Sequence, residues 1–208
     1  QYAPLLMAVT LLNDTLNNKV IINKSIKAPT TGFNTIRTIP TDSLLKIMML
    51  RSDNFYADQI VLMASEQLLG KMDDAALIDT ATKLIFANLP QRMRWVDGSG
   101  LSRYNLNTPE NYVALLKKME NDFSLTRIKG VFAQGGKTSL ASYYKNIPGE
   151  LYAKTGTLGN QVALSGYIIT NKGTRLLFSV LVANHISPSS TPVRKAVENY
   201  LTNIMKLN

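Results

Sequence analysis

The sequence has 208 residues, 45% of them hydrophobic, which is long enough to bury one sizeable core but not two ordinary independent domains. The absence of cysteine excludes disulfides, thiolate metal sites and cysteine nucleophiles, so any nucleophile must be a hydroxyl or an amine. The net charge of +9 would suit an anionic partner, but the 23 lysines and arginines are scattered, which argues against nucleic-acid binding.

Apolar segments of the sequence bear on where the protein resides in the cell. The longest apolar run, residues 176–183, is far shorter than the ~18 to 20 residues that cross a membrane, so we expect no transmembrane segment. The chain opens at Gln1 without the basic start and apolar region of a signal peptide. We therefore expect that a signal peptide has been removed or that the chain is a piece of a longer protein.

The first half of the sequence predicts mainly helices. Apolar residues at helical spacing predict a helix over 4–16, and short β-branched runs predict strands or extended segments at 20–22 and 35–39. Three more helices are expected, each with a cap or stop signal: one capped by Thr41 and Asp42 and ending near 50, one over 55–69 stopped by Gly70, and one capped by Asp73 and ending near 89.

The second half predicts strands after its first helix. We expect a glycine-rich loop at 95–103, a helix from Thr108 and Pro109 to about 120, a loop at 129–137, a short helix near 139–145, strands ending at Lys154 and over 161–170 and 174–183, and a helix over 191–207. Helices followed by strands favour an α+β fold with an antiparallel sheet and packed helices. We expect one domain over 1–208, with a helical lobe near 41–146 and the sheet near 147–208.

Two short motifs carry the candidate chemistry. Ser52-Asp53-Asn54 lies between two predicted helices, and Lys154-Thr155-Gly156 lies at the end of a predicted strand. S-D-N and K-T-G occur together in the sites of serine acyltransferases. Each motif also has a purely structural interpretation, since the first would cap the helix that begins near Phe55 and the second would turn a strand into a loop.

In a site that acylates a serine, each of these side chains has a chemical use. Lys154 can supply charge for a substrate carboxylate or direct proton transfer, Ser52 can relay a proton, and Asn54 can hold a substrate amide. The substrate-binding candidates are Thr155, whose hydroxyl can meet the same carboxylate, Gly156, which permits close backbone approach, and Thr157, whose N–H can form half of an oxyanion hole. The strand edge can bind an extended peptide by strand addition.

Other motifs do not support a second chemistry. Gly135-Gly136-Lys137-Thr138 resembles the end of a phosphate-binding loop, but Val131 stands where that loop needs glycine. His185 is the only histidine, so neither a histidine metal site nor a Ser-His-Asp triad can be assembled. We expect no metal and no cofactor.

From about residue 44 to its end, the sequence resembles the C-terminal half of the D-alanyl-D-alanine carboxypeptidase/endopeptidase type of penicillin-binding protein. The resemblance rests on residues 52–57, 97–106 with Thr108-Pro109, 154–158 and 166–167, and its most specific block runs from Asp97 to Arg103. It implies a β-lactamase/transpeptidase-like fold, incomplete here at its N-terminus. It also implies a serine peptidase of the bacterial periplasm whose partners are peptidoglycan stem peptides ending in D-Ala-D-Ala and β-lactams.

The sequence departs from this family at the nucleophile, which the family carries on an upstream S-x-x-K helix. Ser43-Leu44-Leu45-Lys46 fits the letters, but nine residues of continuous helix at ~100° each would put Ser43 and Ser52 on opposite sides and ~13 Å apart. Ser25-Ile26-Lys27 has the wrong spacing. We therefore expect the chain to lack the acylated serine and to be inactive alone. The alternative is a non-catalytic module that binds peptidoglycan peptides.

The same departure predicts an incomplete sheet. Without the upstream segment the core would have three strands and an unpaired edge at 174–183. We expect this edge to pair with residues 20–22, with a second copy of the chain in a homodimer, or with a lost N-terminal segment.

Overall fold

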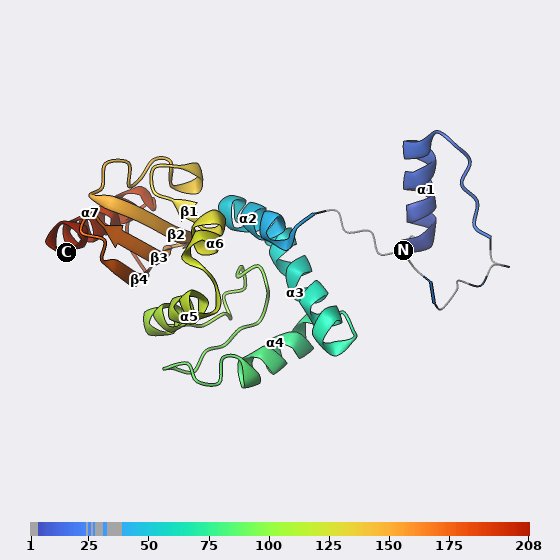
Figure 1. Cartoon of the computed structure of the whole chain (residues 1–208), viewed down its shortest axis with the longest axis horizontal. Coiled ribbons are helices and arrows are strands. Elements are labelled where there is room, and N and C mark those ends of the chain that lie inside the picture. The colour runs from blue at the N-terminus through green and yellow to red at the C-terminus, as the bar shows by residue number, and fades with distance from the viewer. Residues whose placement is uncertain (1–3, 24, 26, 28–30, 33–38) are drawn as a thin grey trace. The chain divides into compact units, whose positions relative to one another are not determined.

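The computed structural model describes residues 4–23, 25, 27, 31–32 and 39–208 (Figure 1). The chain divides into two units, Gln1–Thr38 and Ile39–Asn208. In the first unit, helix α1 (Pro4–Leu16) forms where the apolar spacing predicts it. The expected single domain with lobes near 41–146 and 147–208 stays a prediction.

Residues 20–22, expected as a strand or an extended segment, form no strand. These residues have no regular secondary structure, and the N–H of Val20 donates to Asn13 Oδ1 at 2.5 Å instead of to a partner strand. A β-branched run favours a strand only where another strand pairs with it. The strand expected at 35–39 falls mostly outside the described residues.

Five helices open the second unit: α2 (Thr41–Arg51), α3 (Asn54–Leu69), α4 (Asp74–Leu84), α5 (Pro109–Asp122) and α6 (Leu125–Val131). The side chains of Asp53, Asp73 and Thr108 cap α3, α4 and α5. The predicted cap of α2 is wrong, because Pro40 occupies the N-cap position and Thr41 is already helical. Helix α4 ends five residues before position 89, since the N–H groups of both Ile85 and Phe86 donate to the Ala81 carbonyl and close the helix.

The sheet has four antiparallel strands in the order β1-β2-β3-β4, and not the three expected. The strands are β1 (Ala133–Gln134), β2 (Gly149–Leu158), β3 (Gln161–Thr170) and β4 (Arg175–Ala183), and helix α7 (Thr191–Leu207) follows. Helix α6 and strand β1 occupy much of the stretch expected as a loop, and the short helix before β2 is a single 3-10 turn, η1 (Thr138–Leu140). The predicted hairpin turn between β3 and β4 is confirmed, with Gly173 in the left-handed region at a φ of 82°.

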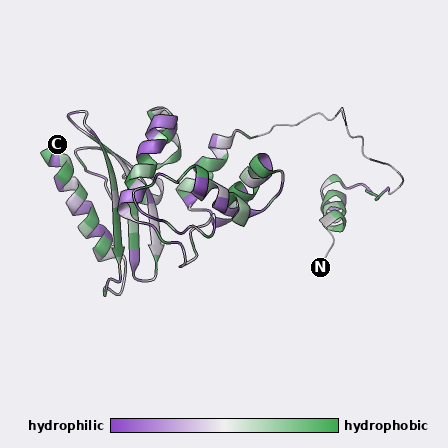
Figure 2. Ribbon diagram, turned by 90° about the horizontal axis from the view of Figure 1, so that it is seen from below, coloured by the Kyte–Doolittle hydropathy of each residue, from purple (hydrophilic) through white to green (hydrophobic). Residues whose placement is uncertain are grey.

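Helices pack on both faces of this sheet (Figures 1 and 2). On one face, α7 covers a core to which β2 contributes Leu151 and Ala153. On the other face, α5 and α6 contribute Leu116 and Ile128 to a core that contains Tyr152 of β2. Because successive side chains of a strand point to opposite faces, this division fixes the direction of every later side chain of β2.

One edge of the sheet is open in the described part of the chain. Strand β4 pairs with β3 along its length and lies at the end of the strand order. Its residues from Leu176 to Val182 are half-buried. Residues 20–22, one of the three partners expected for this edge, form no strand. The partner of the β4 edge stays a prediction.

Candidate active site

Lys154 and Ser52 meet across the fold. The Nζ of Lys154 donates hydrogen bonds to Ser52 Oγ at 2.5 Å and to the Thr155 carbonyl at 2.7 Å. Burial lowers the pKa of Lys154, because removal from water disfavours the charged amine. An amine that loses its proton more readily than usual, in contact with a hydroxyl, can pass a proton to or from a reacting group.

The turn between α2 and α3 presents Ser52 to the lysine. Ser52 ends α2 in the left-handed region, at a φ of 52°, and its N–H donates to the Met48 carbonyl. Asp53 accepts the N–H of Tyr56 at 3.0 Å and so caps α3. The capping interpretation therefore holds for Asp53, and it leaves the Ser52 hydroxyl available to Lys154. Asn54 is the first residue of α3 and is exposed, with its Cα at most ~7 Å from that of Ser52.

The backbone of β2 is open beyond Lys154. Strand β1 pairs only with Tyr152 and Ala153, and the Leu151 carbonyl accepts the N–H of Gly135 on the same side. Backbone groups of alternate residues in a strand point to the same edge. The N–H and C=O groups of Thr155 and Thr157 therefore point to this edge at a position that β1 no longer covers.

The side chains of Thr155 and Thr157 lie on the face of the sheet opposite Lys154. The guanidinium of Arg194, from α7, donates to Thr157 Oγ1 at 2.5 Å. Thr155 lines a small hollow that also includes Arg194 and Tyr143. The structure thus brings Ser52 and Lys154 together and separates Lys154 from both threonine hydroxyls. Arg194 was not among the site residues expected from the sequence, because an arginine near the start of a helix has no distinguishing sequence pattern.

Gly156 shares the face of Lys154. An added Cβ would lie 3.2 Å from the Cβ of Ala163 on β3, so the position is tight. The side-chain hydrogen of glycine leaves the strand edge beside Lys154 accessible to another backbone.

The glycine-rich loop links α3 to the end of β2. The Asp97 carboxylate accepts the N–H groups of Gly100 and Ser102, and Asp58 on α3 accepts the N–H of Ser99 at 2.8 Å. Burial opposes ionisation of Asp97, but hydrogen bonds from Asn105 and the loop backbone outweigh burial and lower its pKa. An Arg103 nitrogen lies 3.3 Å from where a Cβ on Gly159 would stand, in the turn after β2. The loop therefore places a second cation at the end of this strand.

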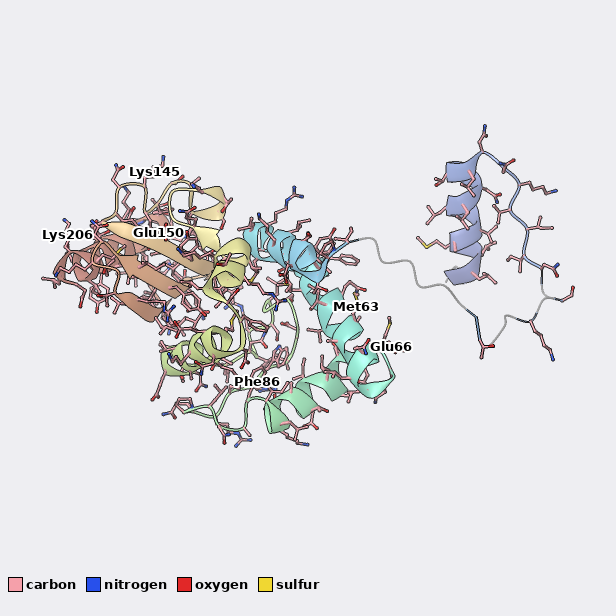
Figure 3. The ribbon with its side chains drawn as sticks, in the orientation of Figure 1. Met63, Glu66, Phe86, Lys145, Glu150 and Lys206 are labelled. Carbon is pink, nitrogen blue, oxygen red and sulfur yellow. The ribbon has the colours of Figure 1, made fainter. Side chains whose placement is uncertain are left out.

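Two S-x-x-K tetrapeptides occur in the chain, and neither meets Lys154. Ser43 and Lys46 line a separate hollow together with Arg127 of α6. Ser142-Tyr143-Tyr144-Lys145, which the sequence analysis overlooked, lies in turns after η1, and Lys145 is exposed (Figure 3). A serine and a lysine three residues apart face the same way on a helix, and the turn at Ser142 does not give them that geometry.

The described residues hold no group of three or more histidine, cysteine, aspartate or glutamate side chains placed to bind a metal ion. None of the helices that the structure describes combines the length and apolar character needed to span a membrane. Gly135 and Gly136 form a turn against Tyr143 and Tyr144. The 3-10 turn η1 that follows has only three residues, which is too short for a phosphate-binding helix N-terminus.

A strand-borne lysine in contact with a serine at a helix junction, beside an open strand edge, defines the class of serine acyltransferase clefts in which S-D-N and K-T-G face one another. The comparison with protein families identifies the particular branch. The chain belongs to the D-Ala-D-Ala carboxypeptidase 3 (S13) family, whose model matches residues 1–204.

Individual relatives agree with this assignment. The D-alanyl-D-alanine carboxypeptidase DacB of Haemophilus influenzae is 28% identical over 153 residues, which are 67% of this chain and 31% of DacB. The crystal structure of penicillin binding protein 4 from the same organism, complexed with a β-lactam, matches 78% of this chain and 41% of its own at 22% identity, with a TM-score of 0.67.

A predatory endopeptidase of Bdellovibrio bacteriovorus, in complex with an immunity protein, matches 99% of this chain and 57% of its own at 20% identity, with a TM-score of 0.65. The chain thus spans about a third of the length of DacB and roughly half of these structures. The α+β fold with an antiparallel sheet, expected from the sequence, is confirmed by these structural matches.

Proposed function

We propose that this chain forms part of the active site of a serine D-Ala-D-Ala carboxypeptidase/endopeptidase that acts on peptidoglycan stem peptides in the bacterial envelope, outside the cytoplasm. The observation that carries the proposal is the 2.5 Å hydrogen bond between Lys154 and Ser52, beside the open edge of β2. Membership of the S13 family and the identity with DacB support the same substrate class.

The geometry suits an extended peptide added to the edge of β2. The outward N–H of Thr157 would donate to the oxygen of the scissile carbonyl as it becomes an oxyanion. A serine nucleophile would form the acyl bond as the peptide C–N bond breaks, and its hydroxyl proton would pass by way of Lys154 and Ser52 to the leaving amine. Asn54, next to Ser52 at the start of α3, would bind the peptide amide before that bond.

We also propose that the acylated serine does not belong to this stretch of chain, so that the stretch alone binds peptide without cleaving it. Ser43 lies in a hollow with Arg127, and Ser142 lies in a turn, so neither is arranged with Lys154. A non-catalytic peptidoglycan-peptide module is the second candidate function, and the same open edge of β2 favours it.

A labelling experiment tests the nucleophile. Fluorescent penicillin is incubated with the chain, and any labelled peptide is mapped by mass spectrometry. We expect no covalent label, and label on Ser43, Ser52 or Ser142 would contradict the proposal.

A binding titration tests the proposed peptide site at the edge of β2. A peptide ending in D-Ala-D-Ala is added to isotope-labelled protein, and amide shifts are followed by NMR. We expect shifts at Thr155 and Thr157 that are lost in Lys154→Met but kept in the control Lys172→Met, which alters an exposed lysine in the β3–β4 turn. Unchanged binding in Lys154→Met would refute the proposed site.

We further propose that the β4 edge pairs with a strand from a longer protein or from a second copy of the chain. The nine-residue edge of β4, whose half-buried residues 176–182 are apolar except for Ser179, forms a template for strand pairing. Amide exchange of β4 at high dilution, with the mass measured by sedimentation, distinguishes the cases. Full protection of both edges of β4 in a monomer that has no added strand would refute this proposal.

A further inference from the structure

The glycine-rich loop packs directly on helix α3, near the start of the helix. A Cβ added to Gly98 would lie 2.8 Å from both the Ala57 carbonyl oxygen and Val61 Cγ2, so glycine permits this close approach of the loop backbone. The N–H of the next residue, Ser99, donates to Asp58 Oδ1 at 2.8 Å. The loop is therefore joined to α3 both by close packing and by a hydrogen bond to a carboxylate.

This contact lies on the face of α3 that carries Asn54. Residues 54, 58 and 61 are spaced by four and three positions, so their side chains follow one another along one stripe of the helix. Asp58 lies one turn beyond Asn54, about 6 Å along the helix axis. Ser52, whose hydroxyl contacts Lys154, is two residues before Asn54. A contact that holds Asp58 in place therefore also holds the start of α3 and the serine before it.

The same loop also contacts the turn after β2. Asp97 closes the loop, because its carboxylate accepts the N–H of Gly100 at 2.6 Å and the N–H of Ser102 at 2.8 Å. A nitrogen of Arg103 then lies 3.3 Å from the position that a Cβ on Gly159 would occupy. The loop thus has one attachment on α3 and a second at the end of β2, which are the elements at which the two motifs lie.

We infer that the glycine-rich loop fixes the start of α3 relative to β2, and that Asp58 is a positioning residue that holds Asn54 where the peptide amide binds. This inference rests on the proposed function and adds to it a residue that belongs to neither motif. The hydrogen bond between Asp58 and Ser99 spans 41 residues of sequence, so it constrains the tertiary arrangement and not α3 alone.

The variants remove this contact in two independent ways. Asp58→Leu keeps the approximate shape of the side chain but removes the acceptor, whereas Asp58→Asn keeps an acceptor oxygen. Gly98→Ala adds the clashing methyl group, and it strains no torsion because Gly98 does not have a positive φ. Glu66→Leu, at an exposed position further along α3, is the matched control (Figure 3). Thermal unfolding of each variant verifies that it is folded.

The first measurement needs no ligand. Nuclear Overhauser effects between the side-chain protons of Ser52 and Lys154 report the contact between the two motifs. We expect this signal to fall by half or more in Asp58→Leu and Gly98→Ala, and to persist in Asp58→Asn and Glu66→Leu. An unchanged signal in folded Asp58→Leu would overturn the inference, and Gly98→Ala decides the question if Asp58→Leu does not fold.

The second measurement separates positioning from general stability. Dissociation constants are obtained by NMR titration for an N-acetylated peptide ending in D-Ala-D-Ala and for its analogue in which an ester replaces the amide before the scissile bond. The ester lacks the N–H donor and is a weaker acceptor. The ratio of the two constants therefore isolates the hydrogen bonds made by that amide.

We expect the wild type, Asp58→Asn and Glu66→Leu to bind the amide about three- to tenfold more tightly than the ester. Asn54→Ala and Asp58→Leu should each bring this ratio close to unity, and the double variant should do no more, because both changes act through the same side chain. A purely structural role for Asp58 would weaken both ligands alike, keep the ratio and overturn the inference. Failure of the wild type to bind either ligand would refute the proposed function, and the first measurement would still decide the inference.

Discussion

The amine of Lys154 lies 2.5 Å from the hydroxyl of Ser52, although 102 residues separate them in the sequence. The contact depends on two local features. Ser52 ends α2 in a left-handed conformation, and Lys154 follows the point where β1 stops covering β2. The proposed chemistry requires both features, so the first prediction concerns this pair.

Lys154 should titrate below 10.5, the ordinary value for lysine, because burial lowers its pKa. Between the two values the unfolded chain binds more protons than the folded chain, so stability rises with pH in that window. Lys154→Met should abolish this part of the rise, measured as the difference between urea unfolding curves of the two proteins across alkaline pH. Identical pH profiles for the two proteins would contradict the lowered pKa.

Asp97→Asn should destabilise the glycine-rich loop. The pKa of Asp97 is lowered in the folded protein, since its hydrogen bonds outweigh the effect of burial. Its contribution to stability is therefore present above the unfolded pKa near 3.8 and is lost as pH falls through the lower folded value. The variant should be less stable than the wild type at neutral pH. The difference in their free energies of unfolding should become smaller as the pH falls into the acid range. Asp79→Asn, on the exposed side of α4, is the control.

Gly166→Ala should disrupt the pairing of β2 with β3. An added Cβ would lie 2.1 Å from the Tyr152 carbonyl oxygen and 2.7 Å from the Cα of Ala153. We expect a loss of about 1 to 3 kcal/mol or more in the free energy of unfolding. Gly130→Ala is the matched control, because nothing lies within 4 Å of its Cβ and it is helical in α6, so it should gain about 0.5 to 1 kcal/mol. Equal effects at the two sites would contradict the sheet register.

Tyr167→Phe should reduce stability by about 0.5 to 1.5 kcal/mol, because the buried hydroxyl donates to the Leu116 carbonyl at 2.7 Å. Burial raises the pKa of Tyr167 to about 12. The folded chain then holds this proton above the ordinary value of 10.0, so its contribution is present below pH 10 and is lost as pH rises toward 12. Tyrosinate absorbance of the two proteins during alkaline titration measures the shift. If the variant lacks a tyrosine that titrates near pH 10 in the wild type, the raised pKa of Tyr167 is contradicted.

Local signals in the sequence predicted most elements correctly. Apolar spacing and caps identified α1, α3, α5 and α7, and the glycine of the 171–173 turn identified the β3–β4 hairpin. The predictions failed where no local signal exists. Strand β1 has two residues and forms only because β2 lies beside it, whereas residues 20–22 have strand composition but form no strand. Pairing between distant segments, and not propensity, decides short strands.

The sequence by itself determined that a serine-acyltransferase pair of motifs is present, because S-D-N and K-T-G are contiguous residue patterns that can be recognised without a structure. Only the tertiary structure decided which side chains of those motifs act together. Strand alternation turns Lys154 toward Ser52 and turns Thr155 and Thr157 toward Arg194 of α7. A strand has two faces, and what covers each face depends on helices encoded far away, so no reading of the motif alone could separate the two cations.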